Sequence, residues 1–253
     1  AIDSLNLWID KTASEQGLNF ELLNAEKEKL KNKDPLSQEQ IEKISKIYTA
    51  NDGKRVFLTF DDGPSKTVTP LILDLLKKEN IKATFFVLGY NAERNPEILK
   101  RVYAEGHYIA NHGYSHKYNE IYNSVDTVIY EYNKTEQCIK NALDNQNYNS
   151  RVFRFPGGSV GGKYNQIKQE AKEVLKQNNV AFLDWNALSN DSAGAHTKED
   201  IMDNITKTVG EKNNVVILMH DASDKILTYE TLQDVINFLK NKGYMFKNLY
   251  DIL

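Results

Sequence analysis

The stretch RVFLTFDDGPS (residues 55–65) is an apolar, β-rich run that ends in two aspartates and a Gly-Pro turn. Six further short apolar runs follow along the chain, and longer amphipathic stretches separate most of them. Because parallel strands require crossover connections, this alternation predicts βαβ units and a mainly parallel sheet. About seven parallel strands in a chain of this length predict an α/β fold, a distorted and incomplete (β/α) barrel. The predicted strands are 55–60, 83–88, 107–111, 151–155, 180–185, 215–220 and 244–249.

Residues 1–50 differ in composition and pattern from the rest, since they are rich in Lys, Glu, Asn and Gln and contain no strand-like run. Ser37 and Gln40 have the spacing of a helix-capping box, and isoleucines recur at helical intervals in the residues that follow. We expect one to three helices here, forming an N-terminal helical extension or linker. The main domain is expected over residues 51–253.

Composition and charge exclude several classes of protein. The 253 residues carry 32 Lys and Arg against 35 Asp and Glu, a formal net charge of −3. The chain therefore lacks the excess of positive charge that is typical of nucleic-acid-binding proteins. No run approaches the roughly 18 consecutive apolar residues of a membrane span. The single cysteine, Cys138, forbids an internal disulfide. The opening AIDSLNLWID has neither a basic start nor an apolar stretch, so we expect a signal peptide to be absent or already removed.

Polar side chains of catalytic types follow four of the predicted strands. Functional groups of (β/α) barrels gather just after the C-terminal ends of the strands, because those ends meet at one rim. The sequence therefore predicts that side chains from four strands converge on one site. They are Asp61 and Asp62 after 55–60, His112 and His116 after 107–111, Arg154 near the end of 151–155, and His220 at the end of 215–220.

His112 and His116 are four residues apart, so one helical turn would place both imidazoles on the same face to bind one ion. A carboxylate from another strand would complete three protein ligands and leave an open position for water, which is typical of a catalytic zinc-type site. Asp61 and Asp62 point in different directions at a strand end, so one can bind the metal while the other faces that water. Mixed nitrogen and oxygen ligands are compatible with Zn²⁺, Co²⁺, Ni²⁺ or Fe²⁺.

The segment TFDDGPS (59–65) resembles the first motif of the polysaccharide deacetylases, carbohydrate esterase family 4, which carry a NodB homology domain. Four further segments follow in the order of that family: a histidine pair, an Arg-containing loop, an Asp-Trp segment and a late Leu-x-His. The resemblance spans about residues 54–253 and implies a polysaccharide deacetylase catalytic domain over 51–253. The four segments are His112…His116, Arg154-Phe155-Pro156-Gly157, Trp185-Asn186…Asp191 and Leu218-Met219-His220.

The resemblance implies roles for the residues at the strand ends. Asp61 matches the general base of the family and His220 matches the general acid. Asp62, His112 and His116 match the metal ligands. The resemblance therefore implies one divalent metal ion as cofactor, with Zn²⁺ as the first candidate and Co²⁺, Ni²⁺ or Fe²⁺ as alternatives.

Two further residues match the partners of the base and the acid. Arg154 matches the residue that keeps the carboxylate of Asp61 ionised and oriented, and Asp191 is similar to the carboxylate that pairs with His220. An arginine beside Asp61 would lower the pKa of that carboxyl, whereas Asp191 would raise the pKa of His220. We expect the two pKa values to be pushed apart, as an acid–base pair requires.

The residues that would bind the substrate match the family pattern less completely. Leu218 matches an apolar wall for the acetyl methyl group, and the N–H of Gly157, which follows Pro156, corresponds to an oxyanion donor. Gly157 stands where the family frequently has an aromatic residue, so the backbone donor remains without that side chain. A serine replaces the usual Trp of the fourth motif and opens that side of the groove. Trp185 either contributes to substrate binding there or packs in the barrel core.

These matches predict a metal-dependent deacetylase that hydrolyses the N-acetyl group of N-acetylglucosamine units in a cell-wall or extracellular glycan. The resemblance points to peptidoglycan, or to a chitin-like glycan, and we expect an exported, cell-surface-associated protein that acts as a monomer. The alternatives are an O-acetyl xylan esterase of the same family, a non-catalytic glycan-binding relative and a metallophosphoesterase. The set of Asp61, Arg154 and His220 argues against glycan binding alone, and the lack of ligands for a second metal argues against the phosphoesterase.

Overall fold

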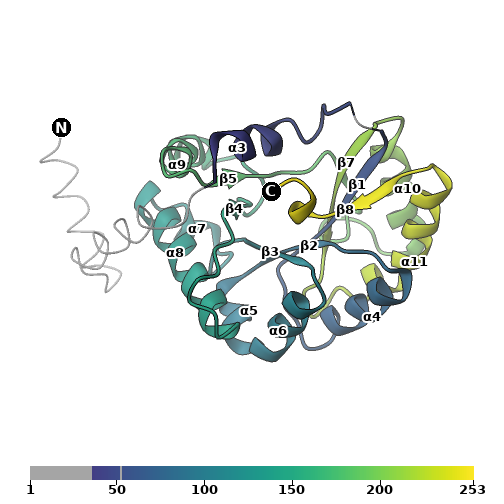
Figure 1. The fold of residues 1–253 in the computed structure, drawn as a ribbon, viewed down its shortest axis with the longest axis horizontal. Coiled ribbons are helices and arrows are strands. Elements are labelled where there is room, and N and C mark those ends of the chain that lie inside the picture. The colour runs from purple at the N-terminus through teal and green to yellow at the C-terminus, as the bar shows by residue number, and fades with distance from the viewer. Residues whose placement is uncertain (1–35, 52) are drawn as a thin grey trace, which may run out of the picture.

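Eight strands, all paired in parallel, form one curled sheet in the computed structural model, which describes residues 36–51 and 53–253 (Figure 1). The strands are β1 (Arg55–Asp61), β2 (Thr84–Val87), β3 (Tyr108–Asn111), β4 (Val152–Phe153), β5 (Ala181–Phe182), β6 (Ala187–Leu188), β7 (Asn214–His220) and β8 (Met245–Lys247). Seven pair in the order β5-β4-β3-β2-β1-β7-β6, and β8 pairs with the first half of β1. Within the described residues, the edge strands β5 and β6 do not pair with each other, so the barrel stays open between them. The predicted incomplete (β/α) barrel is confirmed.

The open side of the barrel explains where the predicted strands were wrong. One strand was expected over 180–185, but β5 has only two residues, and β6 was not predicted. The chain leaves the sheet after β5 because it must cross from one edge strand to the other. The carbonyl oxygens of Leu183 and Asp184 accept hydrogen bonds from the guanidinium of Arg154, at 2.9 and 3.0 Å, instead of from a neighbouring strand. The predicted strand over 151–155 is likewise reduced to the two residues of β4.

Strand β1 is apolar along most of its length because both of its faces are buried. Successive side chains of a strand point to opposite faces, so outward-facing residues pack against helices and inward-facing residues fill the barrel. The outward-facing residues are Val56, Leu58 and Phe60, and the inward-facing residues are Phe57, Thr59 and Asp61. The same alternation on β7 places Leu218 and His220 on the inner face.

Helices surround the sheet, and their buried residues form the outer hydrophobic clusters against it (Figure 1). They occupy amphipathic stretches of the sequence, as crossovers between parallel strands require. None of the helices within residues 36–51 and 53–253 combines the length and the apolar character that a membrane span needs. The helices after β1 are α4 (Thr69–Glu79), α5 (Gly89–Arg94), α6 (Pro96–Ala104), α7 (Tyr118–Ile121), α8 (Val125–Ala142), α9 (Asn165–Gln177), α10 (Lys198–Val209), α11 (Ile226–Asn241) and the 3₁₀ helix η1 (Leu249–Asp251).

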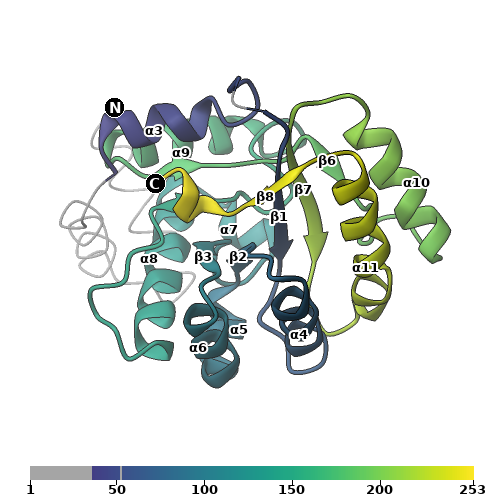
Figure 2. The same cartoon turned by 45° about the vertical axis from the view of Figure 1, so that its right-hand side comes forward.

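Helix α3 (Gln38–Ser45) lies at the end of the sheet where β1 and β7 begin (Figure 2). Ser37 and Gln40 form the predicted capping box at its start, which confirms a helix at this position. Its buried residue Ile44 joins the hydrophobic cluster inside the barrel. This part of the predicted extension therefore covers the end of the barrel opposite the strand C-termini, while residues 1–35 of the extension lie outside the described residues.

Candidate active site and metal centre

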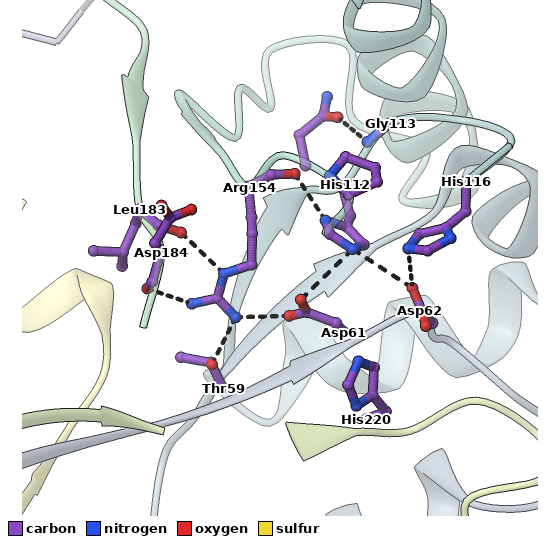
Figure 3. A network of polar contacts seen from close by, with 12 residues as sticks. Thr59, Asp61, Asp62, His112, Gly113, His116, Arg154, Leu183, Asp184 and His220 are labelled. Carbon is purple, nitrogen blue, oxygen red and sulfur yellow. Dashed lines mark hydrogen bonds and ion pairs between the residues drawn. The ribbon is translucent and has the colours of Figure 1, made fainter. Parts of the chain in front are cut away.

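The inner faces of four strands bring ionisable side chains together at one end of the barrel (Figure 3). Asp61 and His220 are register partners at the C-terminal ends of β1 and β7. His112 directly follows β3, and Arg154 directly follows β4. Each occupies an inward-facing position, because side chains alternate between the two faces of a strand. The structure therefore places these four side chains at one rim.

Asp62, His112 and His116 form a set of donor atoms that fits a single cation, the one such set among the described residues. Asp62 Oδ1 lies 3.5 Å from Nε2 of each histidine. Ligand atoms bound to a tetrahedral ion at about 2.1 Å lie about 3.4 Å apart, so the spacing suits one ion. Asp62 Oδ1 is also buried and has no hydrogen-bond partner, which is unfavourable for a carboxylate unless a cation binds there.

The buried imidazole of His112 is held in the tautomer that a metal ligand needs. Its Nδ1 lies 2.8 Å from the carbonyl oxygen of Arg154 and donates a hydrogen bond to it. The lone pair of Nε2 is therefore left facing Asp62 (Figure 3). Burial lowers the pKa of His112 to about 3, so the ring is neutral at neutral pH. A hydrogen bond on the far nitrogen commonly orients a ligating histidine in this way.

The loop that carries His116 corrects the predicted arrangement of the histidine pair. The residues from His112 to His116 do not form a helical turn, since Gly113 and His116 have left-handed backbone with φ of 78° and 58°. Glycine adopts this conformation freely, whereas histidine does so at a cost, so the loop needs support from elsewhere. The buried carboxylate of Glu131 on α8 supplies it by accepting hydrogen bonds from two backbone N–H groups of the loop, at 2.9 and 3.1 Å.

Replacing Glu131 with glutamine is expected to weaken the binding of Zn²⁺ about tenfold, because the loop that positions His116 loses a charged acceptor at nearly constant side-chain volume. Isothermal titration with Zn²⁺ measures this affinity directly. Glu170→Gln, at an exposed position of α9, is the matched control and should bind Zn²⁺ as the wild type does. Equal affinity of E131Q and the wild type would show that the loop keeps its shape without this carboxylate.

A buried ion pair joins Asp61 to Arg154. The Nη1 atom of Arg154 donates to Asp61 Oδ1 at 2.7 Å and to the hydroxyl of Thr59 at 2.8 Å. Burial raises the pKa of the Asp61 carboxyl above its ordinary value, and the guanidinium of Arg154 opposes this rise. Arg154 therefore acts on this pKa in the predicted direction, but the net shift is upward, because the loss of water around the carboxylate outweighs the effect of one guanidinium.

His220 is paired with Asp191, as its Nδ1 lies 2.7 Å from Asp191 Oδ1. The other carboxylate oxygen accepts hydrogen bonds from the backbone N–H of His220 at 2.9 Å and from the hydroxyl of Thr228 at 2.6 Å. Burial favours the neutral imidazole, but the hydrogen bond and the charge of Asp191 outweigh it and raise the pKa of His220 to about 9, in the predicted direction. His220 is therefore a cation at neutral pH and has a proton to donate.

The residues predicted to contact a substrate lie around the same rim but differ in exposure. Leu218 faces the inside of the barrel from β7 and is largely buried. Pro156 is buried, whereas Gly157 is exposed and has a left-handed backbone with φ of 71°. Trp185 packs against the hydrophobic cluster inside the barrel, and a Cβ added to Gly158 would lie 3.3 Å from its ring. The structure thus places Trp185 between the barrel core and the loop of Gly157.

Tyr122 orients the peptide group that joins Pro156 to Gly157. Its buried hydroxyl donates a hydrogen bond of 2.7 Å to the carbonyl oxygen of Pro156. The C=O and N–H of a trans peptide point in opposite directions, so this bond directs the N–H of Gly157 away from Tyr122. Neither Tyr122 nor Glu131 was predicted to belong to the site. In the sequence, each is only a polar side chain within an amphipathic segment. Each binds the backbone of a loop elsewhere in the chain, and the local pattern does not indicate that contact.

Comparisons with known proteins show the family to which this fold belongs. Residues 49–180 match the family model described as polysaccharide deacetylase. A peptidoglycan-N-acetylglucosamine deacetylase of Listeria monocytogenes is 32% identical over 216 residues, which cover 83% of this chain and 41% of the Listeria protein, so this chain spans about two fifths of that relative. A peptidoglycan-N-acetylglucosamine deacetylase of Bacillus cereus is 36% identical over 220 residues, which cover 83% of this chain and 72% of that protein. The structure of a Streptococcus mutans CE4 esterase superposes with a TM-score of 0.72 at 31% identity, covering 85% of this chain and 91% of that chain.

Proposed function

The chain belongs to the polysaccharide deacetylase family, and we propose that it removes the acetyl group from N-acetylglucosamine units of peptidoglycan. One observation carries the proposal: a buried carboxylate, Asp61, and a protonated imidazole, His220, are register partners beside the donor set that includes Asp62. Two relatives that are named peptidoglycan deacetylases, 32% and 36% identical, support the choice of polymer.

Asp62, His112 and His116 would hold the metal ion, and we propose Zn²⁺ because two imidazole nitrogens and one carboxylate are a common set of catalytic zinc ligands. A divalent ion there would polarise the acetyl carbonyl and supply a water that loses its proton near neutral pH. Structural zinc sites use four protein ligands, so a set of three is typical of a catalytic site. The proposed enzyme is therefore a metal-dependent hydrolase.

Asp61 and His220 would transfer the protons. Asp61, held by Arg154, would accept a proton from the attacking water. His220, kept protonated by Asp191, would donate a proton to the nitrogen of the substrate as the C–N bond breaks, because an amine is a poor leaving group until it is protonated. The N–H of Gly157 would stabilise the negative charge that develops on the acetyl oxygen.

The substrate proposal has two further consequences. The methyl end of the acetyl group would lie against Leu218, whose side chain faces the inside of the barrel two positions before His220. Peptidoglycan lies outside the cell membrane, so we also propose that the protein acts outside the cell or at its surface. Neither consequence follows if the substrate is not an acetylated sugar of peptidoglycan.

Acetate release from purified peptidoglycan and from N-acetylated chito-oligosaccharides tests the proposal. We expect release by the protein loaded with Zn²⁺, loss of activity with a chelator, and recovery when Zn²⁺ is returned. Acetylated xylan is the comparison substrate, since faster release from its esters than from the amides would favour an O-acetyl esterase. No acetate from any of these polymers, with any of the candidate metals, would contradict the proposal.

Replacing Asp191 with asparagine is expected to move the alkaline limb of the pH profile of kcat/KM to lower pH. His220 acts as an acid, so activity is lost as the pH rises through its pKa of about 9. Without the carboxylate, burial would bring this pKa to or below the ordinary value of about 6.5, and activity would be lost at least about 2.5 pH units earlier. Asp203→Asn, at an exposed position of α10, should leave the profile unchanged. An unmoved alkaline limb in D191N would assign that limb to a group other than His220.

A further inference from the structure

Tyr118 occupies the space that a side chain at position 157 would fill. A Cβ built on Gly157 would lie 2.5 Å from the hydroxyl oxygen of Tyr118 and 3.0 Å from its Cζ, closer than the packing of real side chains permits. The left-handed backbone of Gly157 also favours glycine. The space beside position 157 is therefore filled by an aromatic ring. The ring belongs to the first residue of α7.

The ring of Tyr118 borders the metal set on one side. Its centroid lies 5.5 Å from that of the His116 imidazole, with the two planes tilted by 46°. On its other side, the ring of Tyr122 lies 5.9 Å away, and the hydroxyl of Tyr122 is bonded to the carbonyl of Pro156. Two neighbouring rings thus hold Tyr118 in place, while 42% of its surface is exposed.

The polar end of Tyr118 is free for a ligand. Its hydroxyl donates to no acceptor within residues 36–51 and 53–253, although it lies directly beside the exposed Gly157. A tyrosine combines an apolar face with one polar group, and this combination suits an amphipathic partner. A sugar ring is such a partner, because its axial C–H groups form an apolar face and its hydroxyl groups surround that face.

We propose that Tyr118 binds the sugar unit that bears the scissile acetyl group, with the tyrosine ring against the apolar face of the sugar and the hydroxyl directed at sugar oxygens. The inference rests on the proposed function and adds a specificity-determining residue to it. In this chain the aromatic surface beside His116 comes from α7, and Gly157 is required because a larger residue would displace that surface.

Tyr118→Ala tests the proposal with the Zn²⁺-loaded protein. We expect kcat/KM for tetra-N-acetylchitotetraose to fall about tenfold, mainly through a higher KM, because the lost contact serves binding. Tyr118→Phe keeps the ring and should lose less than the alanine variant. The metal-dependent hydrolysis of 4-nitrophenyl acetate, which has no sugar, and the affinity for Zn²⁺ should stay at wild-type values in both variants.

Tyr103→Ala is the matched control. Tyr103 is 41% exposed, lies on α6 and packs edge-on against Tyr148, so its loss should leave the kinetics on both substrates unchanged. An unchanged KM of Y118A for tetra-N-acetylchitotetraose overturns the proposal. A parallel loss on 4-nitrophenyl acetate or in Zn²⁺ affinity also overturns it, since Tyr118 would then only support His116. A wild type that releases no acetate from the tetramer marks a different failure, that of the proposed function, and this inference falls with it.

Discussion

Asp61→Asn is expected to lower kcat for acetate release by about 10²–10⁴-fold while Zn²⁺ stays bound. The substitution preserves the shape of the side chain and an oxygen that can accept from Arg154, but an amide cannot take up a proton. Arg154 keeps its hydrogen bonds to Thr59 and to the carbonyl of Leu183, so the guanidinium stays in place. Acetate release at saturating substrate measures kcat, and titration of the same sample measures the affinity for Zn²⁺.

The D61N experiment also distinguishes a base from a ligand. Asp61 Oδ2 lies 3.5 Å from Nε2 of His112, as far from it as Asp62 Oδ1 does. A loss of Zn²⁺ binding in D61N would therefore place Asp61 among the ligands, whereas a wild-type kcat would remove it from the mechanism. Asp203→Asn on the exposed side of α10 serves as the control for the change of charge.

Arg154→Met is expected to reduce the free energy of unfolding by about 3–5 kcal/mol, because it breaks a buried ion pair. The side chain of Arg154 is fully buried, and its removal leaves Asp61 without its charged partner. The carbonyl groups of Leu183 and Asp184 lose their donors at the same time. Methionine is similar in length, so the loss reports charge and hydrogen bonding more than an empty cavity. Denaturant unfolding followed by circular dichroism gives the midpoint and the slope.

Two further variants define what the loss in R154M means. Arg94→Met is the control, because Arg94 is exposed on α5 and stacks over Tyr90 at 4.8 Å, and its effect should stay within about 0.5 kcal/mol. Arg154→Lys keeps the charge without the planar set of donors and should fall between wild type and R154M. A loss below about 1 kcal/mol in R154M would show that other contacts hold the open side of the barrel.

Alternation along the long strands explains why the rim of the barrel was predictable. β1 and β7 are buried on both faces, so their apolar runs mark them as central strands of a parallel sheet. Asp61 and His220 end these runs at inward-facing positions. The position of a residue along its strand defines which face its side chain is on and how far along the barrel axis it lies. Local sequence therefore contained most of the geometry of the acid–base pair.

The histidine loop and the aromatic surface could not be predicted in the same way. A spacing of four residues suggests a helical turn, but His116 is positioned by a loop that depends on Glu131 from α8. Tyr118 meets Gly157 across segments with no pattern that links them. The sign of the pKa shift of Asp61 depends on how completely the rest of the barrel excludes water, which local sequence does not encode.

The guanidinium that steadies the proposed base also ties the segment that crosses the open side of the barrel to β1, so one cation serves both architecture and reactivity. This overlap restricts how the fold can be engineered. A catalytically inert variant of this scaffold would have to retain Arg154 and be silenced elsewhere, for example at His220, whose side chain does not bond to the crossing segment at Leu183 and Asp184. Substitutions at position 154 are therefore expected to impair folding as well as turnover.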